Sequence, residues 1–193
     1  ESDVACALSI ADRLDTLVGL FGIGQPPTGS KDPYALRRAT FGLLRIIIER
    51  NLKLDLSLLV KASYALHKDL SQPLKMVEPQ LLDFMFERLR AYYEDQKVGV
   101  DVYLAVRAHK SNSLLDFHQR LQAVNSFLKL NLVAALVESN KRVVNILSKN
   151  GKGGVTFTRA LVCDAAEIAL ADTLVKVKQS NLAVMHDGNY HEA

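Results

Sequence analysis

The sequence predicts an all-α protein, and three observations support this prediction. Apolar residues recur every three or four positions through nearly every segment, which is the period of an amphipathic helix. Runs in which apolar and polar residues alternate, as they do in strands, are few. Prolines and glycines gather at a small number of points and leave long stretches uninterrupted. With 193 residues, 49% of them hydrophobic, the chain can form the core of one or two helical domains.

The first helix is expected over residues 2–20. Its predicted apolar face also holds a carboxylate, Asp15; the apolar members of that face are Val4, Leu8, Ala11 and Val18. A buried carboxylate needs a partner, because burial of an unpaired charge is costly. We expect Asp15 to pair with Arg37, Arg38 or a backbone amide. The alternative is a metal ligand, but the five histidines are scattered and show no metal-ligand spacing on one helix.

A turn and a second helix follow. Residues 22–30 contain three glycines and two prolines, which are too many breakers for a helix. Asp32 can accept hydrogen bonds from the first helical amides, and Pro33 has a φ that suits the first turn. We therefore expect a helix from Pro33 to residue 50.

The remaining helices are predicted from the same periodicity and from breakers. Pro73 and Pro79 bracket a short segment where helices should stop, so we place a domain boundary there, between 1–74 and 75–193. A glycine-rich run at 151–154 ends another helix. The expected helices after residue 50 are 55–70, 78–95, 99–110, 113–130, 132–149 and 159–178, with another beginning after 181.

One predicted helix, 132–149, carries a compact basic and amide face. Its expected core face consists of Val133, Leu136, Val137, Val144 and Leu147. The opposite side carries Arg142, Asn145 and Lys149, with Lys141 beside them. Lys152 in the glycine loop adds a cation next to free backbone amides, which suits a phosphate contact. Basic residues on an amphipathic helix are also common solvent-facing groups, so this face alone does not establish RNA binding.

A second basic group decorates the predicted helix 33–50. Its members are Lys31, Arg37, Arg38 and Arg45. These side chains are candidates for contacts with RNA, with another protein segment, or with carboxylates of the same chain. No nucleophile with a nearby base is evident, and the loop 151–154 lacks the spacing of a nucleotide-binding loop, so we expect no catalytic residue here.

Two segments resemble the β subunit of bacterial two-subunit glycyl-tRNA synthetases. The first runs from Ala-Asp-Arg-Leu-Asp at 11–15 through the glycine-rich turn to Lys-Asp-Pro-Tyr-Ala-Leu-Arg-Arg-Ala at 31–39. The second is Asn-Lys-Arg-Val-Val-Asn-Ile-Leu at 140–147. The resemblance implies that 1–74 are the helical tail of an HD-like domain with connecting helices. It implies that 75–193 are most of an anticodon-binding helical bundle of the arginyl-tRNA synthetase (DALR) type.

The same resemblance implies a function. The whole enzyme would join glycine to its tRNA with ATP and Mg²⁺, as two α and two β subunits, while this chain would bind tRNA and catalyse nothing. It also implies that Lys141, Arg142, Asn145, Lys149 and Lys152 are the candidate tRNA contacts. Two alternatives remain: a phosphohydrolase with a metal near Asp15, and a helical scaffold that docks only onto protein.

Composition sets further expectations. The formal charge is +3, so RNA binding would need a local patch. Cys6 and Cys163 fall within apolar helical patterns, which predicts buried thiols in a reducing compartment and therefore a cytoplasmic protein. No apolar run reaches the length of a membrane span and no signal peptide is evident. The absence of a starting methionine leads us to expect a piece of a longer protein.

Overall fold

The computed structural model describes residues 2–29, 31–149, 158–159, 162–186 and 190, and these residues form eight α-helices. The chain divides into two compact units, Glu1–Leu121 and Gln122–Ala193. The first unit holds α1 (Asp3–Gly22), α2 (Leu36–Glu49), α3 (Leu56–Leu66), α4 (Leu74–Asp95), α5 (Val100–Arg107) and the start of α6 (Leu114–Phe127). The second holds the end of α6, α7 (Val133–Lys149) and α8 (Ala165–His186). The all-α prediction is confirmed for the described residues.

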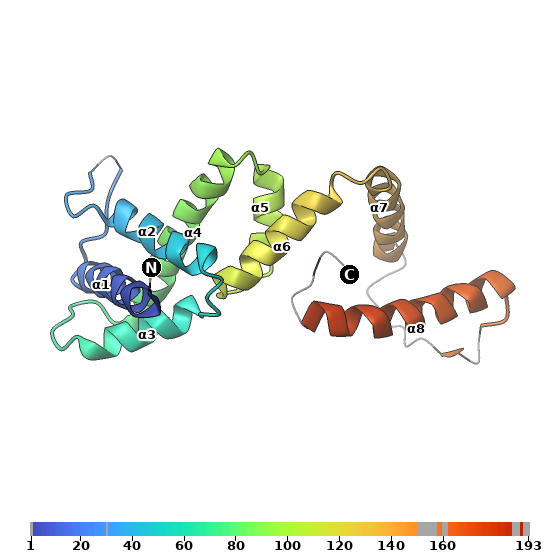
Figure 1. Cartoon of the computed structure of the whole chain (residues 1–193). Coiled ribbons are helices and arrows are strands. Elements are labelled where there is room, and N and C mark those ends of the chain that lie inside the picture. Colours follow the sequence, from blue (N-terminus) through green and yellow to red (C-terminus); the bar gives the residue numbers. More distant parts are fainter. Residues whose placement is uncertain (1, 30, 150–157, 160–161, 187–189, 191–193) are drawn as a thin grey trace. The chain divides into compact units, whose positions relative to one another are not determined.

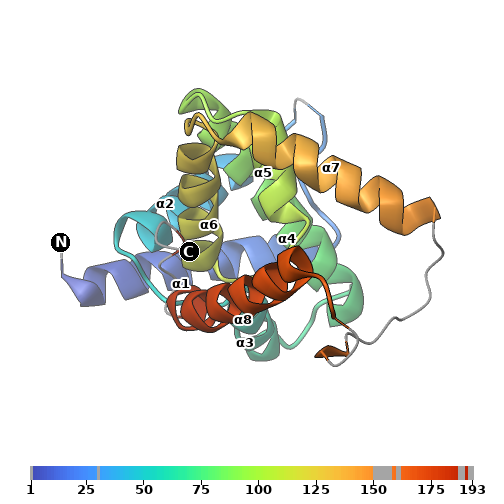
Figure 2. The same cartoon turned by 90° about the vertical axis from the view of Figure 1, so that its right-hand side faces the viewer.

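Helix α4 is the central element of the first unit. It packs against α1, α2, α3 and α5, and α1 also packs against α2 and α3 (Figures 1 and 2). An apolar stripe of α4 supplies the core: Leu81, Met85, Phe86, Leu89 and Tyr93 are all buried. The first half of α6 joins this core through the ring of Phe117, whose centroid lies 5.5 Å from that of Phe86 and 5.3 Å from that of Tyr103.

Helix α2 starts three residues later than predicted. Asp32 does serve the helix start, because its carboxylate accepts hydrogen bonds from the amides of Leu36 (2.8 Å) and Arg37 (3.1 Å). Pro33 lies in a turn instead of the first helical turn, and Ala35 takes a left-handed conformation with φ of 55°. The predicted capping role of Asp32 is therefore confirmed, but the chain makes an extra turn before the helix begins.

Helix α4 contradicts the prediction that Pro79 marks a helix start. The helix begins at Leu74, directly after Pro73, and runs through Pro79. Pro79 lies in the second turn, where its missing N–H forfeits one hydrogen bond, to the carbonyl of Lys75. The neighbouring side chains of Val77 and Leu81 are fully buried, and this packing offsets the loss. The predicted domain boundary between 1–74 and 75–193 rests on the family resemblance as well as on these prolines, and it stays a prediction.

Helices α5 and α6 each end three residues before the predicted residue, and two other boundaries differ more. Helix α3 ends at Leu66 instead of residue 70, because residues after it turn back to α1: the amide of Gln72 donates to the carbonyl of Gly22 at 2.8 Å. A single helix, α8, replaces the two segments expected at 159–178 and after 181. Its first turn is capped by the carboxylate of Asp164, which accepts from the amide of Ala166 at 2.7 Å, and no breaker interrupts its sequence.

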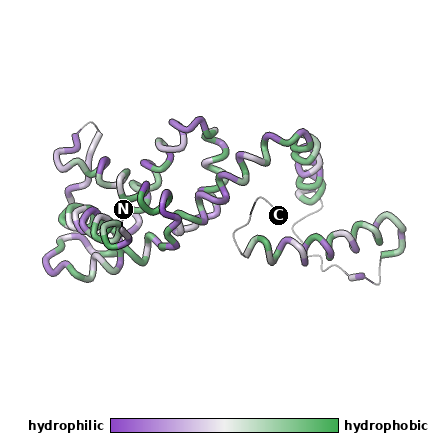
Figure 3. The backbone as a smooth tube through the Cα atoms, viewed as in Figure 1, coloured by the Kyte–Doolittle hydropathy of each residue, from purple (hydrophilic) through white to green (hydrophobic). Residues whose placement is uncertain are grey.

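The second unit leaves most of its apolar side chains exposed. Figure 3 shows hydrophobic segments recurring along α7 and α8. On α7 only Val133 of the predicted core face is buried, whereas Leu136, Val137, Val144 and Leu147 are between 54% and 64% exposed. The prediction that these four residues pack in a core is therefore wrong for the described chain, because no described element covers them.

Candidate nucleic-acid interface

Three of the four residues in the second basic group line one cleft of the first unit. Arg37, Arg38 and Arg45 of α2 face a hollow of about 600 Å³ among α1, α2 and α4. Lys31 lies in the turn before α2 and does not line it. Two further arginines, Arg13 of α1 and Arg88 of α4, also line this cleft. Sequence reasoning missed both, because no local pattern reveals that these three helices meet.

Glycine at position 42 allows Arg13 to reach this cleft. A Cβ atom at Gly42 of α2 would lie 2.8 Å from the Nε atom of Arg13, which is too close for van der Waals contact. Arg13 is held from its own helix, since its guanidinium donates to the Ser9 carbonyl at 2.8 Å and to the Ser9 hydroxyl. The close approach of α1 and α2 therefore brings arginines from both helices to one surface.

The partners of the cleft arginines differ. Arg45 forms an ion pair of 2.7 Å with Glu49, one turn along α2. Arg37 donates to the carbonyl of Gly29, which is a neutral acceptor. Arg38 is exposed and has no ion-pair partner among the described residues. The buried Nε atom of Arg88 lacks a hydrogen-bond acceptor in the described chain. The cleft is therefore a region of largely uncompensated positive charge.

Two aromatic rings belong to the same cleft. Phe41 and Tyr92 meet edge to face with ring centroids 5.7 Å apart, and the guanidinium of Arg45 lies 5.8 Å from the Phe41 ring centroid. Rigid aromatic faces beside arginines are typical of surfaces that bind single-stranded nucleic acid.

The first basic face lies on α7, in the second unit. Lys141, Arg142, Asn145 and Lys149 are all exposed, and the three cations form no ion pair with a described residue. Lys152 lies outside the described residues. The structure thus leaves the predicted α7 face free for a ligand.

Asp15 has a different partner from those predicted. Its Oδ1 atom lies 3.1 Å from Nε2 of His67, and its side chain is 65% exposed. The buried face of α1 is a neighbouring stripe that includes Cys6, Ile10 and Leu14. Neither Arg37 nor Arg38 pairs with Asp15. No three metal-binding side chains gather anywhere in the part of the chain that the structure describes.

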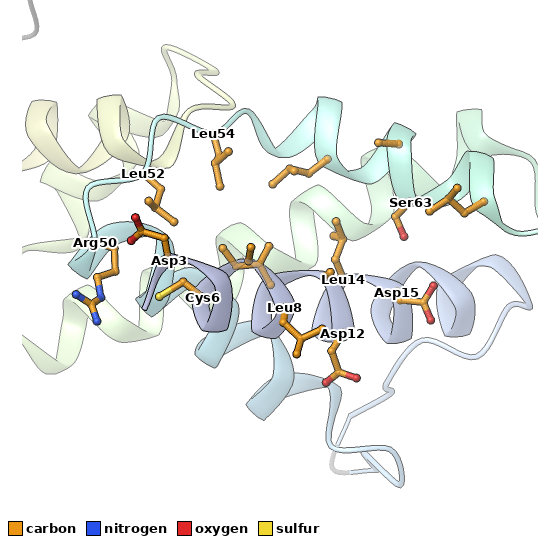
Figure 4. A pocket seen from close by; sticks show the side chains of 16 residues that line it. Asp3, Cys6, Leu8, Asp12, Leu14, Asp15, Arg50, Leu52, Leu54 and Ser63 are labelled. Atoms are coloured by element: carbon orange, nitrogen blue, oxygen red, sulfur yellow. The ribbon is translucent and has the colours of Figure 1, made fainter. Parts of the chain in front are cut away.

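A separate apolar groove of about 910 Å³ lies between α1 and α3 (Figure 4). Leu8 and Leu14 of α1, with Leu52 and Leu54 before α3, contribute to its lining, and Asp3, Asp12 and Asp15 lie along α1 beside it. Its chemistry suits apolar contacts and differs from that of the arginine cleft.

The two cysteines differ in exposure. Cys6 is buried as predicted, whereas Cys163 is exposed and lies two residues before the start of α8 at Ala165. Among the helices described, none has the length and apolar character that a bilayer crossing requires.

Comparisons with known proteins point to one family. Residues 1–108 match the family described as "Glycyl-tRNA synthetase beta subunit". A glycine–tRNA ligase beta subunit of Pseudomonas fluorescens is 48% identical over 188 residues, which cover 97% of this chain and 27% of that protein. The subunit of Pseudomonas syringae pv. syringae is 59% identical over 152 residues, covering 79% and 22%. That of Actinobacillus pleuropneumoniae serotype 5b is 44% identical over 194 residues, covering 100% and 28%. The chain thus spans about a quarter of the length of these relatives.

Proposed function

Because the chain belongs to the family of glycyl-tRNA synthetase beta subunits, we propose that it is a tRNA-binding part of such a subunit. The observation that carries this proposal is the α7 face, where Lys141, Arg142 and Lys149 are exposed and unpaired beside Asn145. The cations attract backbone phosphates, and the Asn145 amide offers both a donor and an acceptor for the edge of an unstacked base. Together these groups suit recognition of an anticodon loop.

We propose no catalytic step for this chain. The whole ligase would use ATP and Mg²⁺, and in this proposal the chemistry of ligation takes place on other parts of the assembly. The proposal includes an α subunit, a second β subunit and a cytoplasmic location.

A titration of the chain against RNA tests the anticodon role. Glycine tRNA and a tRNA with a mismatched anticodon are compared at two salt concentrations, using wild type, Arg142→Ala and Lys149→Ala. Lys176→Ala on α8, also exposed and in the same unit, removes one charge elsewhere and is the matched control. Removal of one cation that binds a phosphate should lower the slope of log affinity against log salt by about 0.7 to 0.9.

The outcomes separate the proposal from its alternatives. Preference for the glycine anticodon, weakened by the two α7 variants and not by the control, supports the proposal. Equal binding of both tRNAs, or equal effects of all three variants, would show that α7 does not read the anticodon. Absence of RNA binding would favour a helical part that docks only onto protein.

A further inference from the structure

We propose that the arginine cleft among α1, α2 and α4 is a second RNA site, which binds backbone phosphates without regard to the anticodon. This inference rests on the proposed RNA-binding role of the chain, but it concerns only the first unit. The α7 face belongs to the second unit. The two sites can therefore be tested separately.

The charge of the cleft favours an anionic ligand. Five arginines line it, against two carboxylates, those of Glu49 and Asp95, which leaves a formal surplus of three positive charges. No lysine is among the lining residues. The planar guanidinium presents paired N–H groups that match two oxygens of one phosphate, so arginine is the usual residue for phosphate recognition.

The contacts inside the protein leave most of this charge available. Among the described residues, Arg45 has a close carboxylate partner, Glu49 at 2.7 Å, and Arg88 has a distant one, Glu87 at 3.9 Å. Arg13 and Arg37 donate to neutral oxygens of Ser9 and Gly29, which position their guanidinium groups without cancelling the charge. These arginines are therefore held in place before a ligand arrives, which lowers the entropy lost on binding.

The charge of Arg88 is only weakly compensated within the described chain. Its Nε–H is buried without a hydrogen-bond partner in the described chain, and its Nη2 atom lies 3.9 Å from a carboxylate oxygen of Glu87. Its guanidinium also lies 5.8 Å from the ring centroid of Phe84. The Arg88 side chain is 33% exposed overall, so its charge adds to the attraction of the cleft for an anion.

The aromatic pair favours RNA over an acidic peptide as the ligand. Phe41 and Tyr92 line the cleft, and the guanidinium of Arg45 lies next to the Phe41 ring. A nucleotide joins a phosphate to a sugar and a flat base, and aromatic rings beside arginines bind both parts. An acidic peptide would satisfy the charges but would leave these rings without a flat partner.

The test uses the full 193-residue chain and two labelled RNAs. One is a hairpin with an unpaired 3′ tail and a loop that lacks the glycine anticodon, and the other is the glycine anticodon stem-loop without such a tail. Arg38→Ala removes an exposed cleft charge that makes no ion pair within the described chain. Arg90→Ala is the matched control, because Arg90 is exposed on α4, pairs with Glu94 and does not line the cleft. Asp95→Asn removes a cleft carboxylate.

Arg38→Ala should weaken hairpin binding by about threefold and lower its salt slope by about 0.7 to 0.9, while Arg90→Ala changes neither. Asp95→Asn should strengthen hairpin binding, which loss of folding cannot mimic. The proposal is overturned if Arg38→Ala and Arg90→Ala act alike, if Asp95→Asn has no effect, or if a glutamate-rich peptide of equal charge displaces the hairpin as well as unlabelled RNA does.

The failure of this inference is distinguishable from that of the proposed function. If the cleft variants alter hairpin binding but the stem-loop shows no anticodon preference, the cleft site holds and the α7 role fails. If Arg142→Ala removes anticodon preference but no cleft variant changes hairpin binding, the α7 role holds and the cleft site fails. If neither RNA binds, both fail.

Discussion

Replacing Tyr93 with phenylalanine should destabilise the first unit in a pH-dependent way. Tyr93 is fully buried, and its hydroxyl lies 2.7 Å from Nδ1 of His118. A buried hydroxyl needs an acceptor, so we assign the Tyr93 hydroxyl as the donor and Nδ1 as the acceptor of a neutral imidazole. The substitution removes the donor and leaves a partly buried nitrogen without its partner.

The expected cost at pH 7.5 is about 1.5 kcal/mol, the usual range for loss of one buried partner. Burial lowers the pKa of His118 below its usual value. The unfolded chain therefore takes up a proton first as the pH falls, so this histidine's contribution to stability is lost between pH 7.5 and 5. The upper limit applies if His118 stays neutral at pH 5 in the folded chain and has a pKa of about 6.5 in the unfolded chain. The free energy of unfolding would then fall by about 2 kcal/mol between pH 7.5 and 5.

The Tyr93→Phe variant should lose less stability than the wild type between pH 7.5 and 5. The hydroxyl donor favours the neutral imidazole, so its removal raises the pKa of His118 and the cost of Tyr93→Phe becomes smaller at pH 5. Tyr103→Phe is the control, because the Tyr103 hydroxyl donates to the carbonyl of Phe86 at 2.6 Å, which does not titrate. Urea unfolding followed by circular dichroism at both pH values measures each cost. Equal costs of Tyr93→Phe at pH 7.5 and 5 would refute the reasoning.

Three further changes test local features of the first unit. Asp32→Ala removes the capping carboxylate of α2 and should cost about 1 kcal/mol in urea unfolding, whereas no change would mean that the cap is unimportant. Gly22→Ala places a Cβ 2.6 Å from a methyl of Leu70 and should cost about 1 to 3 kcal/mol, and a double-mutant cycle with Leu70→Ala should recover part of it. Ser57→Ala should raise the pKa of Glu78, which the Ser57 hydrogen bond chiefly lowers. A carboxylate whose pKa is lower in the folded chain than in the unfolded chain stabilises the fold at pH values above the unfolded pKa. Ser57→Ala should therefore lower the free energy of unfolding by about 1 kcal/mol at pH 7, and the variant should lose less stability than the wild type on acidification. An unchanged acid profile would contradict the assignment.

Much of the helical order could be predicted from the sequence, because long apolar stripes dominate it. The stripe of α4 is a clear case, since Leu81, Met85, Leu89 and Tyr93 all lie in the core. In α1 the helix is predicted correctly but its buried face only in part, because Val18 is buried whereas Val4 and Leu8 are exposed. This helix carries apolar residues on several sides, so periodicity alone could not decide between the stripe with Leu8 and the stripe with Leu14.

The candidate interface shows where sequence reasoning ends. Arg37, Arg38 and Arg45 are recognisable because they share one helix, and the structure brings all three to one cleft. Arg13 and Arg88 lie 75 residues apart in sequence and meet only because α1, α2 and α4 pack together. A single sequence does not reveal which side chains from separate helices will lie close together in the fold. The exposed apolar side of α7 could not be foreseen either, because an amphipathic pattern says that a face prefers burial but not what covers it.

The contact between the end of α1 and the segment after α3 links distant parts of the chain. The Gly22 carbonyl accepts hydrogen bonds from the Gln72 amide at 2.8 Å and from the Ser71 hydroxyl at 3.3 Å, and the Tyr64 hydroxyl donates to the Gln72 carbonyl at 2.7 Å. The last turn of α1 thus depends on residues about fifty positions later. In native-state hydrogen exchange, the amides at the end of α1 and that of Gln72 should open together as one cooperative unit, so α1 reaches its full protection only once the α3–α4 connection has folded.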